Sequence, residues 1–306
     1  MQKYSIFNLI KNAFSGHQNW DLAWKDPTPK KEYDVVIIGG GGHGLATAYY
    51  LAKEHNITNV AIIEKGWIGG GNVGRNTTII RSNYMHDDNA LFSEFGMDLW
   101  RKMSQDLNYN VMFSPRGIIN LAHSDAQMNV YARRGNSMRL NGIDAVLLNR
   151  EQVKEIIPMA DFSENVRFPI FGGLMQPSAG TARHDAVAWG YARQADSMGV
   201  DIIQNCEVVG FDVSDGKIKG VRTSRGDIKV KKIGLCVAGS TNILAEKLNM
   251  TLPVETHLLQ ACVSEPVKPV LDRVVTFGAG HFYICLLYTS DAADEGLGVD
   301  LGGRRI

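Results

Sequence analysis

Residues 33–55 read YDVVIIGGGGHGLATAYYLAKEH, and this stretch decides the fold. A short apolar run of strand-forming residues ends at four glycines, and a helix-forming segment follows. The glycines fit the pattern G-x-G-x-x-G as Gly39, Gly41 and Gly44. The first permits a tight turn, the second lets the backbone approach a pyrophosphate, and the third lets the helix lie close to the strand. We therefore predict a strand–turn–helix unit that binds a dinucleotide at the helix N-terminus, with Gly42 in the same turn.

The next apolar segment supplies an acidic residue at the expected place. Residues 61–65 read AIIEK, so Glu64 ends a second strand twenty residues beyond Gly44. A carboxylate at this position typically binds the hydroxyl groups of a ribose. The glycine pattern alone is weak evidence, and a glycine-rich turn with a chance acid is the alternative. The two features together predict a dinucleotide site.

Composition limits the classes of partner. The 306 residues include 32 Lys plus Arg and 32 Asp plus Glu, so no net charge favours nucleic acid or an anionic membrane. No signal peptide is visible, and the glycines in the longest apolar run argue against a membrane span. We expect a cytoplasmic protein without disulfides or a metal site, because the cysteines show no metal-like spacing. They are Cys206, Cys236, Cys262 and Cys285.

Periodicity predicts the remaining elements. Apolar residues at four-residue steps predict a helix over 84–107, and two shorter helices are expected within 124–142 and 150–158. The Pro-Arg-Gly sequence inside 111–122 predicts a hairpin. Asp-Gly at 215–216 and Arg-Gly at 225–226 predict two further hairpins. Two prolines in DPTPKK predict an extended N-terminal arm over 1–32 that packs on the body or on a partner.

The segment from Cys285 onward differs from the rest. It reads CLLYTSDAADEGLGVDLGGRRI, has no period, and resembles the translation of a transposon-end adaptor used in sequencing libraries. We therefore expect residues 285–306 to be a non-native tail and the natural sequence to be truncated near Ile284. A genuine flexible tail is the alternative.

A second glycine cluster decides between cofactors. Residues 66–84, GWIGGGNVGRNTTIIRSNY, resemble the flavoproteins of the D-amino-acid oxidase and sarcosine oxidase superfamily, in which this loop wraps FAD. Residues 206–211, CEVVGF, resemble the strand whose backbone meets the adenine, and residues 236–248 resemble a second flavin-side turn. The resemblance implies non-covalent FAD held by the glycine turn and by further residues. These are Glu64, Lys65, Asn72, Arg75, Asn76, Thr77, Val208, Ala238 and Gly239.

The resemblance also implies the architecture. We expect an α/β protein in which a Rossmann-like FAD-binding domain, residues 33–110 and 160–250, is interleaved with a substrate domain. The substrate domain is expected to be α+β, with a mixed antiparallel sheet built from residues 111–159 and 251–284.

Within the superfamily the match narrows to the beta subunits of heterotetrameric sarcosine oxidases. Residues 181–196, TARHDAVAWGYARQAD, and 200–208, VDIIQNCEV, carry it. The resemblance places a second flavin, FMN, covalently on His184, and neutral imidazole is nucleophilic enough for such a bond. The alternative is a helix capped by Thr181 with His184 as an ordinary polar residue in its first turn.

The resemblance further implies an activity and partners. Members of this family oxidise sarcosine to glycine at FAD, and electrons pass to FMN and then to oxygen, giving hydrogen peroxide. The one-carbon unit passes to tetrahydrofolate. The beta subunit assembles with alpha, gamma and delta subunits, and NAD is expected on the alpha subunit.

A small amino acid needs its carboxylate held, and arginine pairs with carboxylates through two parallel hydrogen bonds. Arg81 matches the carboxylate-binding arginine of the superfamily; a surface arginine ending a strand is the alternative. Tyr283 lies where related oxidases carry active-site aromatic residues. The family's oxygen-handling basic residue and its last flavin turn are expected beyond Ile284.

Three other functions compete with this hypothesis. The first is a related amine oxidoreductase of the dimethylglycine dehydrogenase or D-amino-acid oxidase type, which would lack a flavin on His184. The second is a catalytically silent subunit that only binds cofactor. The third is a nicotinamide-dependent dehydrogenase, which would be colourless.

Overall fold

A computed structural model describes residues 6–16, 18, 22–77, 79–163, 165–265, 268, 270–278 and 282–285. The chain forms two compact units. Unit 1 comprises Met1–Thr78, Trp100–Met112 and Arg183–Cys262, and unit 2 comprises Ile79–Leu99, Phe113–Ala182 and Val263–Ile306. These bounds differ from the predicted domains: segments 79–99 and 160–182 belong to unit 2, and segment 251–262 belongs to unit 1. The first two segments pair or pack with unit 2 strands, which no local sequence signal specified.

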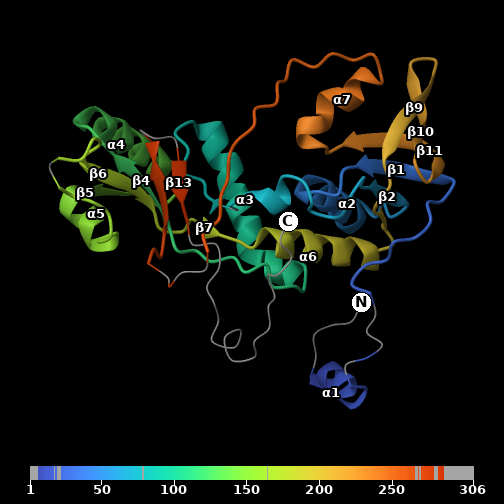
Figure 1. Ribbon diagram of the computed structural model, residues 1–306, viewed down its shortest axis with the longest axis horizontal. Helices are drawn as coiled ribbons and strands as arrows, with labels where there is room; N and C mark the ends of the chain where they lie inside the picture. Colours follow the sequence, from blue (N-terminus) through green and yellow to red (C-terminus); the bar gives the residue numbers. More distant parts are fainter. Residues whose placement is uncertain are drawn as a thin grey trace. The chain divides into compact units, whose positions relative to one another are not determined.

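Unit 1 is built on a six-stranded sheet with the order β8-β2-β1-β11-β10-β9. Four neighbouring strands are parallel, namely β8 (Asp201–Ile203), β2 (Val60–Ile63), β1 (Glu32–Ile38) and β11 (Gly226–Leu235). β10 (Lys217–Thr223) and β9 (Val208–Ser214) continue the sheet as antiparallel strands. Figure 1 shows β9, β10 and β11 next to one another, with β11 beside β1. The hairpins predicted at 215–216 and 225–226 are confirmed.

Two helices are connected to the parallel strands of unit 1. α2 (Gly42–His55) leaves the glycine turn after β1, and α6 (His184–Ser197) precedes β8. Their contact is made by aromatic rings, with Tyr49 and Tyr191 edge to face at 5.4 Å between centroids. α2 is capped at its C-terminus by Asn56, whose φ of 54° is left-handed, as is common after a helix. The strand–turn–helix–strand unit predicted from residues 33–64 is therefore present.

Short elements complete unit 1. They are η1 (Val73–Arg75) after β2, η2 (Ala238–Ser240) after β11, and α7 (Thr241–Glu246). The buried core between the sheet and its cover contains Val36, Ile38, Ile63 and Phe211. Branched apolar residues occupy the central strands almost continuously, as expected for a parallel sheet covered on both faces.

Unit 2 contains a five-stranded sheet with the order β13-β12-β4-β6-β5. The strands are β13 (Phe282–Ile284), β12 (Val274–Phe277), β4 (Ile118–Ala122), β6 (Gly172–Gln176) and β5 (Val146–Asn149). Only the pair β12–β4 is parallel, so the sheet is mixed, as predicted. A two-stranded sheet joins β3 (Ile79–Ile80) to β7 (Gly180–Thr181).

The helices of unit 2 lie against opposite faces of this sheet. α5 (Arg150–Ile156) contributes Val153 to a core with Ile119 and Leu148. α4 (Asp125–Leu140) contributes Met138 to a second core with Leu174. Because neighbouring residues of a strand face opposite sides, Asn120, the cross-strand partner of Leu174, lies on the α4 side. α3 (Asp87–Asp106) falls within the predicted helix 84–107, and the boundary between the units lies inside it.

Two predictions of local structure are wrong. Residues 111–122 do not form a hairpin: β4 is a single strand, and Ser114 instead bridges to Thr181. Pro115 and Gly117 turn the chain, but the segments before and after them do not pair as strands. The arm is also not wholly extended, because α1 (Ile6–Phe14) is a helix. Pro27 constrains only its neighbours and leaves the distant helix unaffected.

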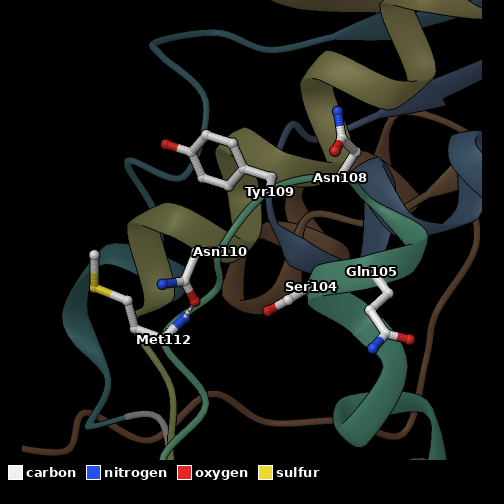
Figure 2. A pocket seen from close by; sticks show the side chains of 6 residues that line it. All are labelled: Ser104, Gln105, Asn108, Tyr109, Asn110 and Met112. Carbon is white, nitrogen blue, oxygen red and sulfur yellow. Dashed lines mark hydrogen bonds between the residues drawn. The ribbon is translucent and has the colours of Figure 1, made fainter. Parts of the chain in front are cut away.

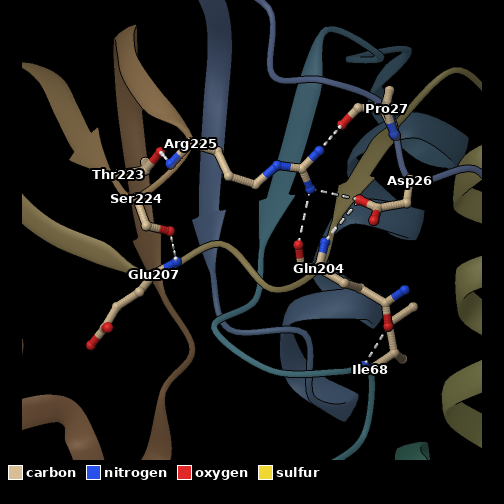
Figure 3. Close-up of polar contacts among 8 residues, drawn as sticks. All are labelled: Asp26, Pro27, Ile68, Gln204, Glu207, Thr223, Ser224 and Arg225. Carbon is tan, nitrogen blue, oxygen red and sulfur yellow. Dashed lines mark hydrogen bonds and ion pairs between the residues drawn. The ribbon is translucent and has the colours of Figure 1, made fainter.

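The described end of the arm packs on unit 1, as predicted. Arg225 binds the carboxylate of Asp26 and the carbonyl of Gln204, each at 3.0 Å (Figure 3). The side-chain oxygen of Gln204 accepts a hydrogen bond from the N–H of Ile68 at 2.9 Å. The arm and the second glycine loop are thus held by one network of polar contacts.

Candidate flavin and substrate sites

The protein itself requires two glycines of the first turn. Gly39 has a φ of 109°, and a Cβ there would lie 2.3 Å from the carbonyl oxygen of Cys236. A Cβ on Gly44 would lie 1.9 Å from the carbonyl oxygen of Gly39. Both distances are far below van der Waals contact. The tight turn and the close helix–strand approach predicted from the sequence are therefore features of this fold.

Gly41 is different, because protein packing does not demand a glycine there, and Gly42 is crowded only by one side-chain methyl group. The nearest heavy atom to a Cβ on Gly41 is Val73 Cγ2 at 3.7 Å, and the same atom lies 3.3 Å from a Cβ on Gly42. The first turn of α2 has neither a side-chain cap nor an acidic residue. Its N–H groups are therefore suited to a phosphate, and the space at Gly41 lets a ligand approach the backbone.

Glu64 ties the first glycine turn to the second. Its Oε2 accepts a hydrogen bond from the N–H of Gly40 and its Oε1 from the N–H of Gly66, both at 2.8 Å. Each oxygen keeps further acceptor capacity, so the carboxylate can also receive hydroxyl groups. The bridging role was not predicted; the acidic residue between two glycine clusters is the signal that could have shown it.

The second glycine loop lies on the first. The N–H of Gly69 donates to the carbonyl of Gly40 at 3.0 Å, and the N–H of Gly74 donates to the carbonyl of Gly69 at 2.8 Å. Asn76 Nδ2 binds the carbonyls of Asn72 and Val73 and so closes η1. Of the other predicted cofactor residues in this region, Lys65 and Arg75 are exposed and Thr77 is half-buried.

Two more predicted segments meet the glycine turn within unit 1. The N–H of Cys206 donates to the backbone carbonyl of Glu64 at 2.9 Å, which places the segment that leads into β9 and its buried Val208 beside the end of β2. The N–H of Cys236 donates to the carbonyl of Ile38 at 2.8 Å. The turn at Ala238 and Gly239 follows directly, and Ala238 has a left-handed φ of 46°. The structure therefore brings together segments that are about 200 residues apart in the sequence.

His184 is the first residue of α6, and the helix begins later than in the alternative in which Thr181 is its cap. Arg183 is the N-cap, and Thr181 lies in β7 and caps nothing. Arg183 instead pairs with Asp185 at 2.8 Å. Burial lowers the pKa of His184, Arg183 lowers it further, and Asp185 acts in the opposite direction. Within the described part of the chain, Nδ1 of His184 is buried and has no hydrogen-bond partner.

A hollow of about 480 Å³ is lined by residues of the segment 104–112. This segment runs along α6: the carbonyl of Leu107 accepts a hydrogen bond from Gln194 at 2.8 Å, and the carbonyl of Val111 accepts one from the N–H of Arg183 at 3.0 Å. Figure 2 shows the amide and hydroxyl groups along this segment. The lining residues are Ser104, Gln105, Asn108, Tyr109, Asn110 and Met112. No sequence motif indicated this hollow.

Arg81 lies in unit 2, within a network of polar side chains. Its Nη1 donates to Oδ1 of Asn83 at 2.5 Å, and its guanidinium lies 4.7 Å from the ring centroid of Tyr84. Asn83 Nδ2 donates to Oδ1 of Asn120 at 2.7 Å, and Asn120 in turn donates to Thr276. These amides were not predicted, because isolated Asn and Thr residues carry no recognisable spacing.

Tyr283 lies on β13, where it is 50% exposed. It pairs across the strands with Thr276, and Thr276 pairs with Asn120. Directly opposed residues share a face of the sheet, so Tyr283 lies on the same face as the network around Asn120.

Residues 34–291 match the model of the family described as DAO, FAD dependent oxidoreductase. The chain belongs to this family. It is an FAD-dependent oxidoreductase with the mixed α/β fold of that family. The sarcosine oxidase subunit beta of Rhizobium meliloti is 57% identical over 98% of this chain and 71% of its own length. The protein of that name in Rhodobacter capsulatus is 50% identical over 93% and 68%.

Solved structures agree with the fold. The L-proline dehydrogenase of P. horikoshii matches with a TM-score of 0.72 and 25% identity, over 83% of this chain and 67% of its own. The glycine oxidase of Bacillus cereus matches with a TM-score of 0.60 and 23% identity, over 70% and 57%. In the described parts of the chain no helix is long and apolar enough to cross a membrane. The same parts hold no cluster of metal-ligating side chains, and their four cysteines are free.

Proposed function

We propose that this chain oxidises sarcosine to glycine as the beta subunit of a multi-subunit oxidase. The single observation that carries the proposal is the match over nearly the whole chain to proteins named sarcosine oxidase subunit beta. In this proposal the first glycine turn, the second glycine loop and Glu64 form a cofactor cradle in unit 1, and Arg81 of unit 2 binds the substrate. FAD, when bound, accepts the electrons of the amine.

The fit of FAD rests on the glycine turn. Gly41 leaves space above the first turn of α2, where free N–H groups would hold the pyrophosphate. Glu64 would accept hydroxyl groups of the ribose while it keeps Gly40 and Gly66 in place. Val208 and Gly239 lie on segments that reach the same turn and would line the remaining cofactor.

On the substrate side, Arg81 would bind the carboxylate. Only its Nη1 makes a hydrogen bond among the described residues, which leaves the Nε–Nη2 edge for a bidentate pair. Asn83 and Tyr84 hold the guanidinium in one orientation. A site of this kind selects a small amino acid by its carboxylate.

We further propose that His184 carries FMN covalently. Burial lowers the pKa of the imidazole, so the neutral form that can act as a nucleophile prevails at neutral pH. The segment 104–112 runs along the same helix and reaches its N-cap at Val111, and the hollow that this segment lines offers room for a ligand. With FMN present, oxygen would accept the electrons and be reduced to hydrogen peroxide.

Partners follow from the same proposal. A protein whose relatives are named as subunits belongs to a multi-subunit complex. We propose alpha, gamma and delta partners, NAD on the alpha subunit, and transfer of the one-carbon unit to tetrahydrofolate. The test is co-expression of the full-length gene with its neighbours, followed by native mass and by assay of glycine, peroxide and methylenetetrahydrofolate. Glycine formation without folate or a partner would support the alternative of a self-sufficient amine oxidase.

A further inference from the structure

Two arginines of unit 2 meet at a single asparagine. Arg81 donates from Nη1 to the side-chain oxygen of Asn83 at 2.5 Å. Arg134, on α4, donates from Nε to the backbone carbonyl of the same residue at 2.6 Å, and its Nη2 binds this oxygen as well. One residue therefore links the two guanidinium groups, one through its side chain and the other through its backbone.

The asparagine that joins them cannot move freely. Asn83 is fully buried, and its Nδ2 donates to Oδ1 of Asn120 at 2.7 Å. Asn120 donates onward to Thr276, and the Thr276 hydroxyl faces the carbonyl of Ile119 at 3.4 Å. Because each amide uses its oxygen on one side and its nitrogen on the other, the orientation of the whole chain is fixed. The position of Arg81 is therefore set by residues of three separate elements.

Among the described residues, no ion pair neutralises the positive charges of Arg81 and Arg134. Glu94, an acidic side chain of the same unit, instead accepts a hydrogen bond from Ser82 at 2.6 Å. Burial lowers the pKa of Arg134, and the charge of Arg81 lowers it further. Two like charges close together in a partly buried place favour the binding of an anion that neutralises them.

We propose that Arg134 is a positioning residue of the carboxylate site, which holds the backbone of Asn83 and adds a second positive charge behind Arg81. The inference rests on the proposed role of Arg81 in binding substrate carboxylate. It goes further by assigning the preference for an anionic over a neutral ligand to two cations. Arg134 directs its Nε and Nη2 to the carbonyl of Asn83, and we assign its effect on the ligand to its charge.

Variants at Arg134 can separate its charge from its hydrogen bonds. Arg134→Lys keeps the charge and one donor, whereas Arg134→Gln keeps a donor to the Asn83 carbonyl and removes the charge. Arg133→Gln is the matched control, because Arg133 is the neighbouring exposed residue of the same helix. Titration calorimetry on the flavin-loaded, assembled enzyme would measure binding of acetate and of its neutral analogue acetamide.

We expect Arg134→Gln to weaken acetate binding at least about ten-fold and to leave acetamide binding unchanged. Arg134→Lys should stay within a few-fold of the wild type, and the control should match it. Equal losses in the Lys and Gln variants, or equal losses for acetate and acetamide, would reduce Arg134 to a structural support and overturn the inference. If Arg81→Ala abolishes acetate binding while both Arg134 variants keep it, the proposed function stands and this inference fails. If the wild type does not bind acetate, both fail.

Discussion

The carboxylate of Glu64 accepts a hydrogen bond from the N–H of Gly40 at 2.8 Å and thereby joins the end of β2 to the glycine turn after β1. The same carboxylate holds Gly66 at the start of the second glycine loop. Glu64 is thus a structural support of the cradle as well as a predicted ligand of the cofactor.

Glu64→Ala should therefore weaken the protein before any cofactor is added. The change leaves two backbone N–H groups without their partner, which typically costs about 1–3 kcal/mol each when the groups are buried. Denaturant unfolding of the flavin-free protein measures the loss. Lys65→Ala is the control, because Lys65 is exposed. Unchanged stability in Glu64→Ala would mean that the bridge between the loops contributes nothing.

Two glycine variants should separate folding from cofactor binding. Gly44→Ala brings a Cβ to 1.9 Å from the carbonyl oxygen of Gly39, so the protein should lose its fold or most of its stability. Gly41→Ala meets nothing closer than 3.7 Å, so it should fold normally. It should nevertheless bind FAD at least about ten-fold more weakly, because the added methyl occupies the place of the pyrophosphate. Fluorescence titration with FAD and thermal unfolding are the measurements. Full FAD affinity in a folded Gly41→Ala protein would move the cofactor away from this turn.

Arg81→Ala should weaken the binding of the amino-acid substrate. Removal of one partner of a buried charge pair costs about 2–5 kcal/mol, so the apparent affinity for sarcosine should fall by at least about thirty-fold. Steady-state kinetics and titration with acetate measure the effect, with Arg133→Ala as the control. An Arg81→Ala enzyme that keeps wild-type affinity for sarcosine would place the carboxylate elsewhere.

The pH dependence of stability should report the environment of His184. Burial holds the pKa of this imidazole below its unfolded value of about 6.5. Between these two values the unfolded chain binds more protons than the folded chain, so stability falls as the pH is lowered through 6.5 toward the folded pKa. His184→Gln should lose less stability than the wild type between pH 7 and pH 5. Denaturant unfolding of both proteins at each pH measures this difference. If the unfolding free energy changes equally with pH in the two proteins, the prediction is contradicted.

The sequence specified the parts of this fold that depend on local pattern. Gly39, Gly44 and Glu64 could be placed because each occupies a position of a motif with fixed spacing. The bridge that Glu64 makes between the two glycine turns was not among the predictions. The two-residue turns after β9 and β10 could be placed for the same reason. The helix at 6–14 was not predicted, because the expectation of an extended arm rested on Pro27 and Pro29, which lie far from it in the sequence.

Long-range relationships could not be read in this way. Nothing in 111–122 shows that β4 pairs with β6 and β12, because the residues of a strand do not specify which distant strands it pairs with. Asn83, Asn120 and Arg134 become neighbours only when three elements assemble around the sheet of unit 2. The residues of the cradle were predictable from motifs, whereas the polar network behind Arg81 was visible only in three dimensions.

Anaerobic addition of sarcosine to the full-length, assembled enzyme tests the central claim most directly. The account predicts that the visible absorbance of bound flavin bleaches, and that air restores it with release of peroxide. After acid precipitation, one flavin should leave the chain and the other should remain on the peptide that contains His184. His184→Ala should lose only the retained flavin and should still bleach. A yellow enzyme whose absorbance does not change with sarcosine, or a colourless protein, would contradict the account.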